Sequence, residues 1–308
     1  MIAVILAKKI LSLFLIMVMG AALVKSKVLR AEDSKSISVV TLYLVMPCVI
    51  ISSFQVEYTE EIRDGLILAL IGAVLVHAVL IAVTELLGRA LGWDPVEKDS
   101  AIYSNAGNLI IPIVTAMLGK EWIIYTSAFL SVQLILLWSH GKMVLCGERR
   151  IEIKKIATNV NMISIFAGIL LFICRIQLPA VLQDSIDTVG SMVGPAAMIV
   201  TGMLIGNMNL KKLFSYRKLP LMIFVRLVGF PVLNIALLKL SGLSRMVPAG
   251  ETILLITLLA TITPSASTIT QMSQVYGKDA DYASAINVAT TLLCIVTMPL
   301  MVMIYQYI

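Results

Sequence analysis

The chain has 308 residues, of which 59% are hydrophobic and only 14% are charged, and its mean hydropathy is +0.97. Since about a quarter of the residues of a soluble domain are charged, this composition excludes a soluble globular protein. The net charge of +6 comes from residues at the edges of apolar runs, so it does not indicate a nucleic-acid partner. The partner that the composition predicts is a lipid bilayer.

Ten apolar runs follow one another along the chain, separated by short connectors. A helix needs about 20 mostly apolar residues to span a bilayer. The runs therefore predict an all-α polytopic membrane protein with ten transmembrane helices and little chain left for a soluble domain. In chain order they cover 3–24, 37–54, 66–91, 101–118, 122–145, 160–176, 189–208, 219–240, 253–272 and 283–308.

Positive charge is divided unevenly between the two sides of such a protein. The connectors after the first, third, fifth, seventh and ninth runs hold 16 of the 24 Lys and Arg residues, and the opposite side holds seven. Cytoplasmic connectors carry the excess of positive charge in membrane proteins. We therefore expect a plasma-membrane protein with both termini on the extracytoplasmic side and the basic stretch 147–155 in the cytoplasm.

Four prolines recur at similar spacings in the two halves of the chain. Pro47 and Pro112 are 65 residues apart, and Pro195 and Pro264 are 69 residues apart. Five helices per half is an odd number, so the second half must enter the membrane from the opposite side. Inverted repeats with paired broken helices are typical of secondary transporters. We expect a first repeat over 1–146, a cytoplasmic connector over 147–157 and an inverted second repeat over 158–308.

The fourth run contains the polar stretch SNAGNLIIPIV. Pro112 removes a backbone donor and frees the carbonyl of Asn108, a break that lipid does not tolerate unless protein or water faces it. Asn105 and Asn108 lie three residues apart and share one helix face. Gly107 lets a backbone or a substrate approach closely. These four residues are expected to form one half of a substrate site.

The ninth run repeats this arrangement with different chemistry. Pro264 lies in the stretch ATITPSAST, where hydroxyl groups can cap half-helices or bind a ligand. We expect Thr263, Pro264 and Ser265 to form the second half of the site. Half-helix N-termini facing the membrane centre would suit a carboxylate.

Two segments resemble the auxin efflux carrier family. The pattern N-x-G-N-x-x-x-P at 105–112 resembles the signature of that family's fourth helix, and the tail from TPSAST to the end is similar to the family's last two helices. The resemblance covers essentially the whole chain. It implies ten helices in two inverted repeats, with broken helices 4 and 9 crossing near the membrane centre, and transport of small organic anions such as auxin, malate or malonate. The hydroxyl residues after Pro264 differ from the asparagine found nearby in many relatives, so the substrate itself does not carry over.

Four further polar residues lie inside apolar runs and are secondary site candidates. Arg226 is the one basic residue well inside a run; an intramembrane charge is a functional candidate, although its long stem is expected to snorkel to the cytoplasmic edge. His77 could titrate near neutral pH, although packing with a hydrogen bond is the favoured interpretation. Gln133 and Asn287 could line the site or bond neighbouring helices.

The coupling ion is left open between H⁺ and Na⁺. No Asp or Glu lies in the middle of the fourth or ninth run, which argues against an acidic proton relay there. Sodium could be held by amide, hydroxyl and carbonyl oxygens, so a sodium-coupled symporter of the bile-acid type is the alternative. No catalytic pattern or Cys/His cluster occurs, so neither an enzyme, a cofactor nor a structural metal is expected; a channel or sensor is less favoured. A homodimer is a candidate assembly.

Overall fold

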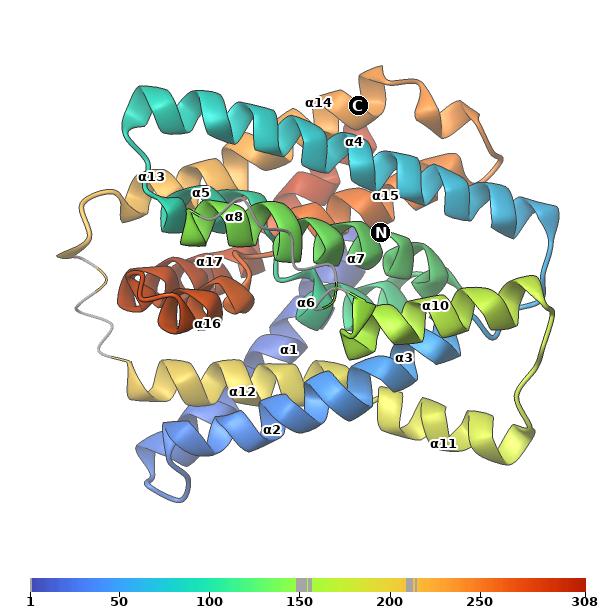
Figure 1. The fold of residues 1–308 in the computed structure, drawn as a ribbon, viewed down its shortest axis with the longest axis horizontal. Coiled ribbons are helices and arrows are strands. Elements are labelled where there is room, and N and C mark those ends of the chain that lie inside the picture. The colour runs from blue at the N-terminus through green and yellow to red at the C-terminus, as the bar shows by residue number, and fades with distance from the viewer. Residues whose placement is uncertain (1, 148–153, 155–156, 209–212, 214) are drawn as a thin grey trace.

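The computed structural model describes residues 2–308 apart from 148–153, 155–156, 209–212 and 214. The described residues form helices and no strands, and their one extended pairing is an isolated antiparallel bridge between Ser104 and Ser265 (Figure 1). The predicted all-α class is confirmed. The expected connector 147–157 lies largely outside the described residues.

Several helical segments have the length and apolar composition of membrane spans. Among the described residues, six meet both criteria, and three further apolar helices are shorter. This confirms a multi-pass membrane protein. The six segments are Ala31–Ser53, Glu60–Leu91, Lys120–Cys146, Ala180–Asn207, Leu219–Leu240 and Ala280–Tyr307, and the shorter helices are Ala106–Met117, Val160–Ile173 and Gly250–Thr261.

Four of the six longer segments consist of more than one helix. In chain order the α-helices are α1 (Ile2–Lys25), α2 (Ser34–Val40), α3 (Met46–Ser53), α4 (Glu60–Leu91), α5 (Pro95–Ile102), α6 (Ala106–Met117), α7 (Ile123–Leu136), α8 (Lys142–Cys146), α10 (Val160–Ile173), α11 (Ala180–Gly190), α12 (Val193–Asn207), α13 (Leu219–Phe224), α14 (Phe230–Leu240), α15 (Gly250–Thr261), α16 (Ser267–Val275) and α17 (Ala280–Tyr307).

Three long segments contain a π-helical turn. The turns η2 (Thr41–Val45), η4 (Leu137–Gly141) and η6 (Val225–Gly229) join α2 to α3, α7 to α8 and α13 to α14. Such turns inside α-helices are rare and occur frequently at functional sites. One of them carries a candidate site residue, because Arg226 lies in η6.

The helices pack as two bundles. In the first bundle, α1 packs most extensively against α12, and α3 packs against α10 and α11. In the second bundle, α4 packs against α7 and α15, and α16 packs against α17. Helix α6 belongs to the second bundle but also contacts α1 and α12, so it lies where the two bundles meet. In Figure 1, α2, α3 and α12 run through the lower part of the view and α4 through the upper part.

Glycines allow α1 and α12 to approach closely. Gly202 and Gly206 are four residues apart on α12, and a Cβ on Gly206 would lie 2.8 Å from the carbonyl oxygen of Ala21. A Cβ on Gly202 would clash with the carbonyl of Met17. Small residues at this spacing bring helix backbones together in membranes, where van der Waals packing drives association.

The break in the fourth segment lies earlier than the sequence predicts. We expected Pro112 to break the helix, but Pro112 lies inside α6, and the chain instead leaves the helical conformation between α5 and α6, at 103–105. The expected position was therefore wrong for this segment. The ring of Pro112 packs against α12, where a Cβ on Gly194 would lie 2.9 Å from it. The break in the ninth segment, at 262–266, does contain Pro264, as expected.

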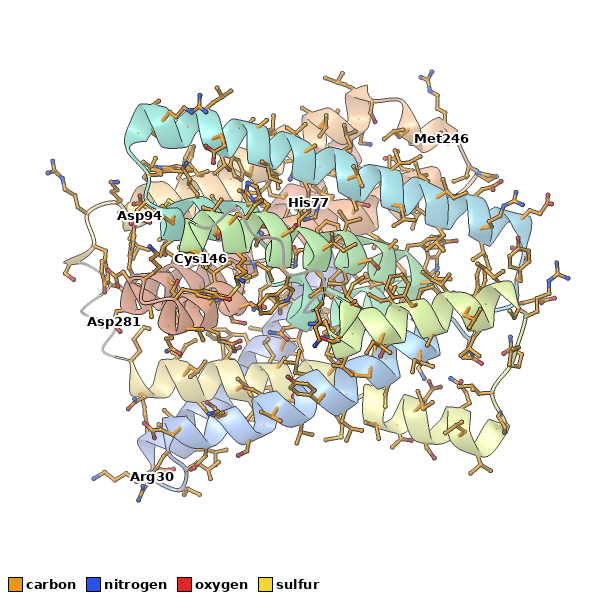
Figure 2. All side chains as sticks on the ribbon, in the orientation of Figure 1. Arg30, His77, Asp94, Cys146, Met246 and Asp281 are labelled. Atoms are coloured by element: carbon orange, nitrogen blue, oxygen red, sulfur yellow. The ribbon has the colours of Figure 1, made fainter. Side chains whose placement is uncertain are left out.

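The connectors lie at two opposite ends of the molecule. In Figure 2, Arg30, Asp94, Cys146 and Asp281 lie toward the left, whereas Met246 lies on the right. The first four residues belong to connectors after odd-numbered expected segments or to their margins, and Met246 belongs to a connector after an even-numbered one. This alternation is what repeated membrane crossing requires.

Candidate functional site

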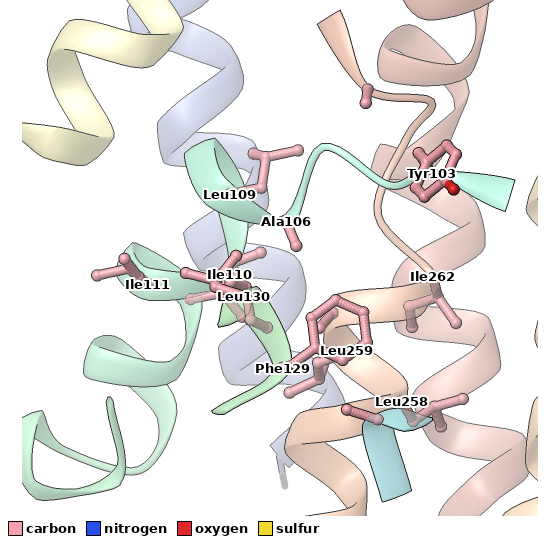
Figure 3. Packing of buried hydrophobic residues seen from close by; sticks show 14 of the residues in the cluster. Tyr103, Ala106, Leu109, Ile110, Ile111, Phe129, Leu130, Leu258, Leu259 and Ile262 are labelled. Carbon is pink, nitrogen blue, oxygen red and sulfur yellow. The ribbon is translucent and has the colours of Figure 1, made fainter. Parts of the chain in front are cut away.

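The two breaks meet and hydrogen-bond through their backbones. The amide of Asn105 donates to the carbonyl of Pro264 at 2.8 Å, and the amide of Ala266 donates to the carbonyl of Tyr103 at 3.0 Å. These bonds form the Ser104–Ser265 bridge. Figure 3 shows the extended chain between Tyr103 and Ala106 and the buried apolar residues packed around it. Four half-helices therefore end at one crossing, with α6 and α15 packed together on one side and α5 and α16 on the other.

Polar side chains from two long helices hold the break segments. Gln133 on α7 accepts hydrogen bonds from the amide and hydroxyl of Ser104 and donates to its carbonyl at 2.9 Å. Two residues of α17 hold Ser265. The side-chain amide of Asn287 donates to the carbonyl of Ser265, and the hydroxyl of Thr290 accepts from the backbone amide of Ser265 at 3.2 Å. Gln133 and Asn287 thus satisfy backbone groups that the breaks free, which is the helix-bonding role considered for them.

Arg226 binds the crossing and does not snorkel. Its side chain is fully buried, and its guanidinium donates to the carbonyls of Ala101, Thr261 and Thr263 at 2.7–3.0 Å. These carbonyls lie at the C-terminal ends of α5 and α15, which carry partial negative charge. One cation therefore neutralises both negative helix ends, and the snorkelling interpretation was wrong.

The positive, N-terminal ends at the crossing belong to α6 and α16, and among the described residues no acidic side chain lies in the first turn of either helix to compensate them as Arg226 compensates the negative ends. Neither α6 nor α16 has a side chain that caps its N-terminus. Amide groups at such ends, together with the helix dipole, form a ready site for an anion. Since the negative ends are compensated by Arg226 and the positive ends are not capped, the electrostatics of the crossing favour an anionic ligand.

The two asparagines lie together beside the N-terminus of α6. The side-chain amide of Asn108 donates to the Oδ1 atom of Asn105 at 2.9 Å. Among the described residues, Nδ2 of Asn105 and Oδ1 of Asn108 have no hydrogen-bond partner. A Cβ on Gly107 would meet only Cε of Met46 on α3, at the ordinary contact distance of 3.9 Å, so α6 faces the first bundle here without close packing. The structure brings together Asn105, Gly107 and Asn108, but not Pro112.

The second-repeat residues have divided roles. Thr263 turns its hydroxyl back to the carbonyl of Ala260 at 3.0 Å, and its own carbonyl is bound by Arg226, so Thr263 supports the backbone. Pro264 contributes the carbonyl that bonds Asn105. The hydroxyl of Ser265 is buried and, within the described part of the chain, has no hydrogen-bond partner. Of the three, Ser265 has the polar group available for a ligand.

The two histidines make their hydrogen bonds to groups other than the uncapped helix ends. His77 is buried within α4, where Nδ1 lies 2.8 Å from the carbonyl of Ala73 and the ring packs against Phe129. This geometry is that of a packed, hydrogen-bonded histidine. His140 lies 2.9 Å from the hydroxyl of Tyr103, the residue that begins the first break.

The sequence reasoning missed three residues of this region. Asp99 and Glu97 are fully buried on α5, and Tyr103 is buried at its end. Glu97 and Asp99 were overlooked because the fourth run was taken to start at residue 101, and Tyr103, although inside that run, was not singled out among its residues. The signal that could have placed them is the capping box of Asp94 and Glu97 with Pro95 between them, which marks a helix start at this point.

Comparison with known families agrees with this architecture. The profile described as "Membrane transport protein", the domain of the auxin efflux carrier family, matches residues 5–153 and 148–302. The chain belongs to this family. It is a family of membrane transporters and not of enzymes. As an auxin efflux carrier family member, the chain is therefore a membrane transport protein. A search of curated proteins finds no match to the sequence.

Proposed function

We propose that this transporter is a secondary active carrier that moves a small organic anion, a mono- or dicarboxylate, across the plasma membrane. The observation that carries the proposal is the electrostatic asymmetry of the crossing, in which the N-termini of α6 and α16 are uncapped while Arg226 binds the opposite helix ends. A carboxylate would receive hydrogen bonds from the α6 backbone, from Nδ2 of Asn105, from the second N–H of the Asn108 amide and from the Ser265 hydroxyl.

The transport cycle that we propose is alternating access between the two bundles. Gly107 of α6 faces Met46 of the first bundle, and α6 also contacts α1 and α12, so a solute bound beside Gly107 would lie between the bundles. Movement of one bundle against the other would expose it to either side. In this proposal the chain forms ten membrane segments as two inverted repeats, residues 1–146 and 158–308, joined by 147–157. The second broken helix of each repeat would supply half of the site.

Orientation and assembly are part of the same proposal. The excess of positive charge in the odd-numbered connectors supports a cytoplasmic location for them and extracytoplasmic termini. A homodimer in the plasma membrane is the assembly that we propose to test alongside the monomer.

Purified protein in proteoliposomes tests this function directly. Uptake and efflux of a panel of radiolabelled mono- and dicarboxylates would be measured with a pH gradient, a sodium gradient and no gradient. We expect saturable movement of at least one carboxylate. Movement driven by sodium alone would favour the bile-acid symporter type, and no movement of any carboxylate would contradict the proposal.

A further inference from the structure

A buried carboxyl group lies on the half-helix that leads into the crossing. Asp99 is on α5, and its side chain is 0% exposed. Within the described part of the chain, neither Oδ1 nor Oδ2 has a hydrogen-bond partner, and no ion pair involves Asp99. The proposed binding groups and the helix packing described above make no use of this residue.

The charges around Asp99 leave it without a dedicated counter-ion. Lys98 and Glu85 act on it with opposite sign, and they are paired with each other at 3.0 Å. Arg226, on the adjoining turn η6, is bound by three carbonyls. Charged and titratable groups also lie on α5 and on the helices and turns around it. They include Asp94, Glu97, Lys98 and Tyr103 at or near α5, His77, Glu85 and Arg89 on α4, His140, Lys142 and Cys146 on η4 and α8, Arg226 on η6, Tyr276 after α16, and Asp281 and Tyr282 on α17.

Glu97, two residues earlier, shows what a stabilised carboxylate looks like here. It accepts hydrogen bonds from the amide of Asp94, the ammonium of Lys218 and the hydroxyl of Tyr282. Asp99 has none of these partners. A buried carboxylate without a partner is very costly in free energy, so the group takes up a proton and becomes neutral.

The position of Asp99 couples it to the crossing. Tyr103 is one helical turn further along α5, and its carbonyl accepts the Ala266 amide in the bridge between the breaks. Its hydroxyl contacts His140 at 2.9 Å and the carbonyl of Leu136 at 3.0 Å. Any movement of α5 relative to α4 and α8 would therefore change the surroundings of Asp99 and the geometry of the crossing together.

We propose that Asp99 is the proton-binding residue that couples transport to a proton gradient. This inference rests on the proposed carrier function. In the conformation described, Asp99 is a neutral acid; in the opposite one, its O–H bond releases the proton to water and the carboxylate is hydrated. An anion at the crossing and an ionised Asp99 would repel each other, so proton and anion bind cooperatively. Each proton therefore travels with a substrate anion.

The test compares wild type with D99N and D94N in proteoliposomes loaded with a pH-sensitive dye, using a carboxylate from the panel that the wild type transports. D99N mimics the neutral acid, so we expect counterflow exchange within about twofold of wild type but at least about tenfold less accumulation under a pH gradient. Substrate-linked proton movement should also be lost. D94N is the matched control at the start of the same half-helix and should keep pH-driven accumulation.

Three outcomes would overturn the inference while leaving the carrier function intact. In the first, D99N still accumulates substrate under a pH gradient. In the second, only a sodium gradient drives transport by the wild type. In the third, transport by the wild type moves no protons. If D99N does not fold, D99E decides: it should keep proton coupling with a shifted pH profile, and uncoupled transport by D99E would contradict the proposal. A wild type that moves none of the carboxylates would instead refute the carrier function itself.

Discussion

At the scale of single residues, the crossing separates groups that hold the backbone from groups that are free to bind. Three side chains donate hydrogen bonds to backbone carbonyls at the two breaks, namely Gln133, Asn287 and Arg226. Asn105 and Asn108 bond each other and retain one amide nitrogen and one oxygen without a described partner. The first group is therefore expected to govern stability and the second group to govern transport.

Asn108→Ala should reduce transport without unfolding the protein. The substitution removes a half-buried amide that bonds only Asn105, so stability should change by about 1 kcal/mol or less. Carboxylate uptake in proteoliposomes should fall by about tenfold or more, because one charge-assisted hydrogen bond is lost. The control is Thr115→Val in the same helix, whose hydroxyl bonds only the carbonyl of Ile111. Parental transport by a folded Asn108→Ala would show that these amides are structural.

Arg226→Met should destabilise the fold. The change leaves three buried carbonyls without their donor, and each costs roughly 1–3 kcal/mol. We expect the apparent Tm in detergent to fall by at least about 5 °C. Arg63→Met is the control, because it removes ion pairs with the exposed Glu60 and Asp64, and such pairs contribute about 1 kcal/mol at most. Equal Tm values for the two variants would contradict the bridging role of Arg226.

At the scale of elements, the sequence predicts helices well and their interruptions less well. Apolar runs of sufficient length identify the membrane segments because no other backbone conformation satisfies itself in lipid. The position of the first break was missed because Tyr103, Ser104 and Asn105 carry no helix-breaking residue; bonds from Gln133 and from the second break hold this segment extended. Pro112, the obvious breaker, is accommodated inside α6 next to Gly194.

The roles of the polar side chains were also predicted only in part. Polar residues inside apolar runs were recognisable as site candidates from the sequence alone. Which of them face a ligand depends on contacts more than 100 residues apart, such as that between Arg226 and Ala101. Local pattern carries no information about such pairs.

Close packing of α1 against α12 gives a prediction at this scale. Gly202→Val would place methyl groups against the backbone at Met17, so the two helices must separate. Overpacking of this kind costs about 1–3 kcal/mol or more, and thermal unfolding should occur at a lower temperature. Gly107→Ala adds a Cβ that meets nothing nearer than Met46 at 3.9 Å and should unfold like wild type. If both variants melt together with wild type, the close approach of α1 and α12 is not a major source of stability.

At the scale of the whole molecule, two bundles meet at α6 and where α1 packs against α17, and the connectors lie at opposite ends. This arrangement gives a solute at the crossing access to either side once the bundles move relative to each other. The proposed orientation follows from charge, since Arg30, Asp94, Cys146 and Asp281 lie toward one end, and the connectors that they belong to or adjoin are rich in Lys and Arg in the sequence.

Cysteine labelling in intact cells tests that orientation. In a variant with the four native cysteines replaced, Met246→Cys should react with a membrane-impermeant maleimide added outside. Arg30→Cys should react only after the membrane is permeabilised, because it lies on the positive side. The reverse pattern would invert the topology, and labelling of both positions from outside would refute the alternation of connectors.

The central claim is that a carboxylate binds at the crossing between the N-termini of α6 and α16. An experimental structure of the protein with a transported carboxylate bound tests it most directly. We predict a carboxylate oxygen within hydrogen-bond distance of the Asn108 amide or the backbone amides at the start of α6. A carboxylate seated elsewhere, with the crossing unchanged and unoccupied, would contradict the account.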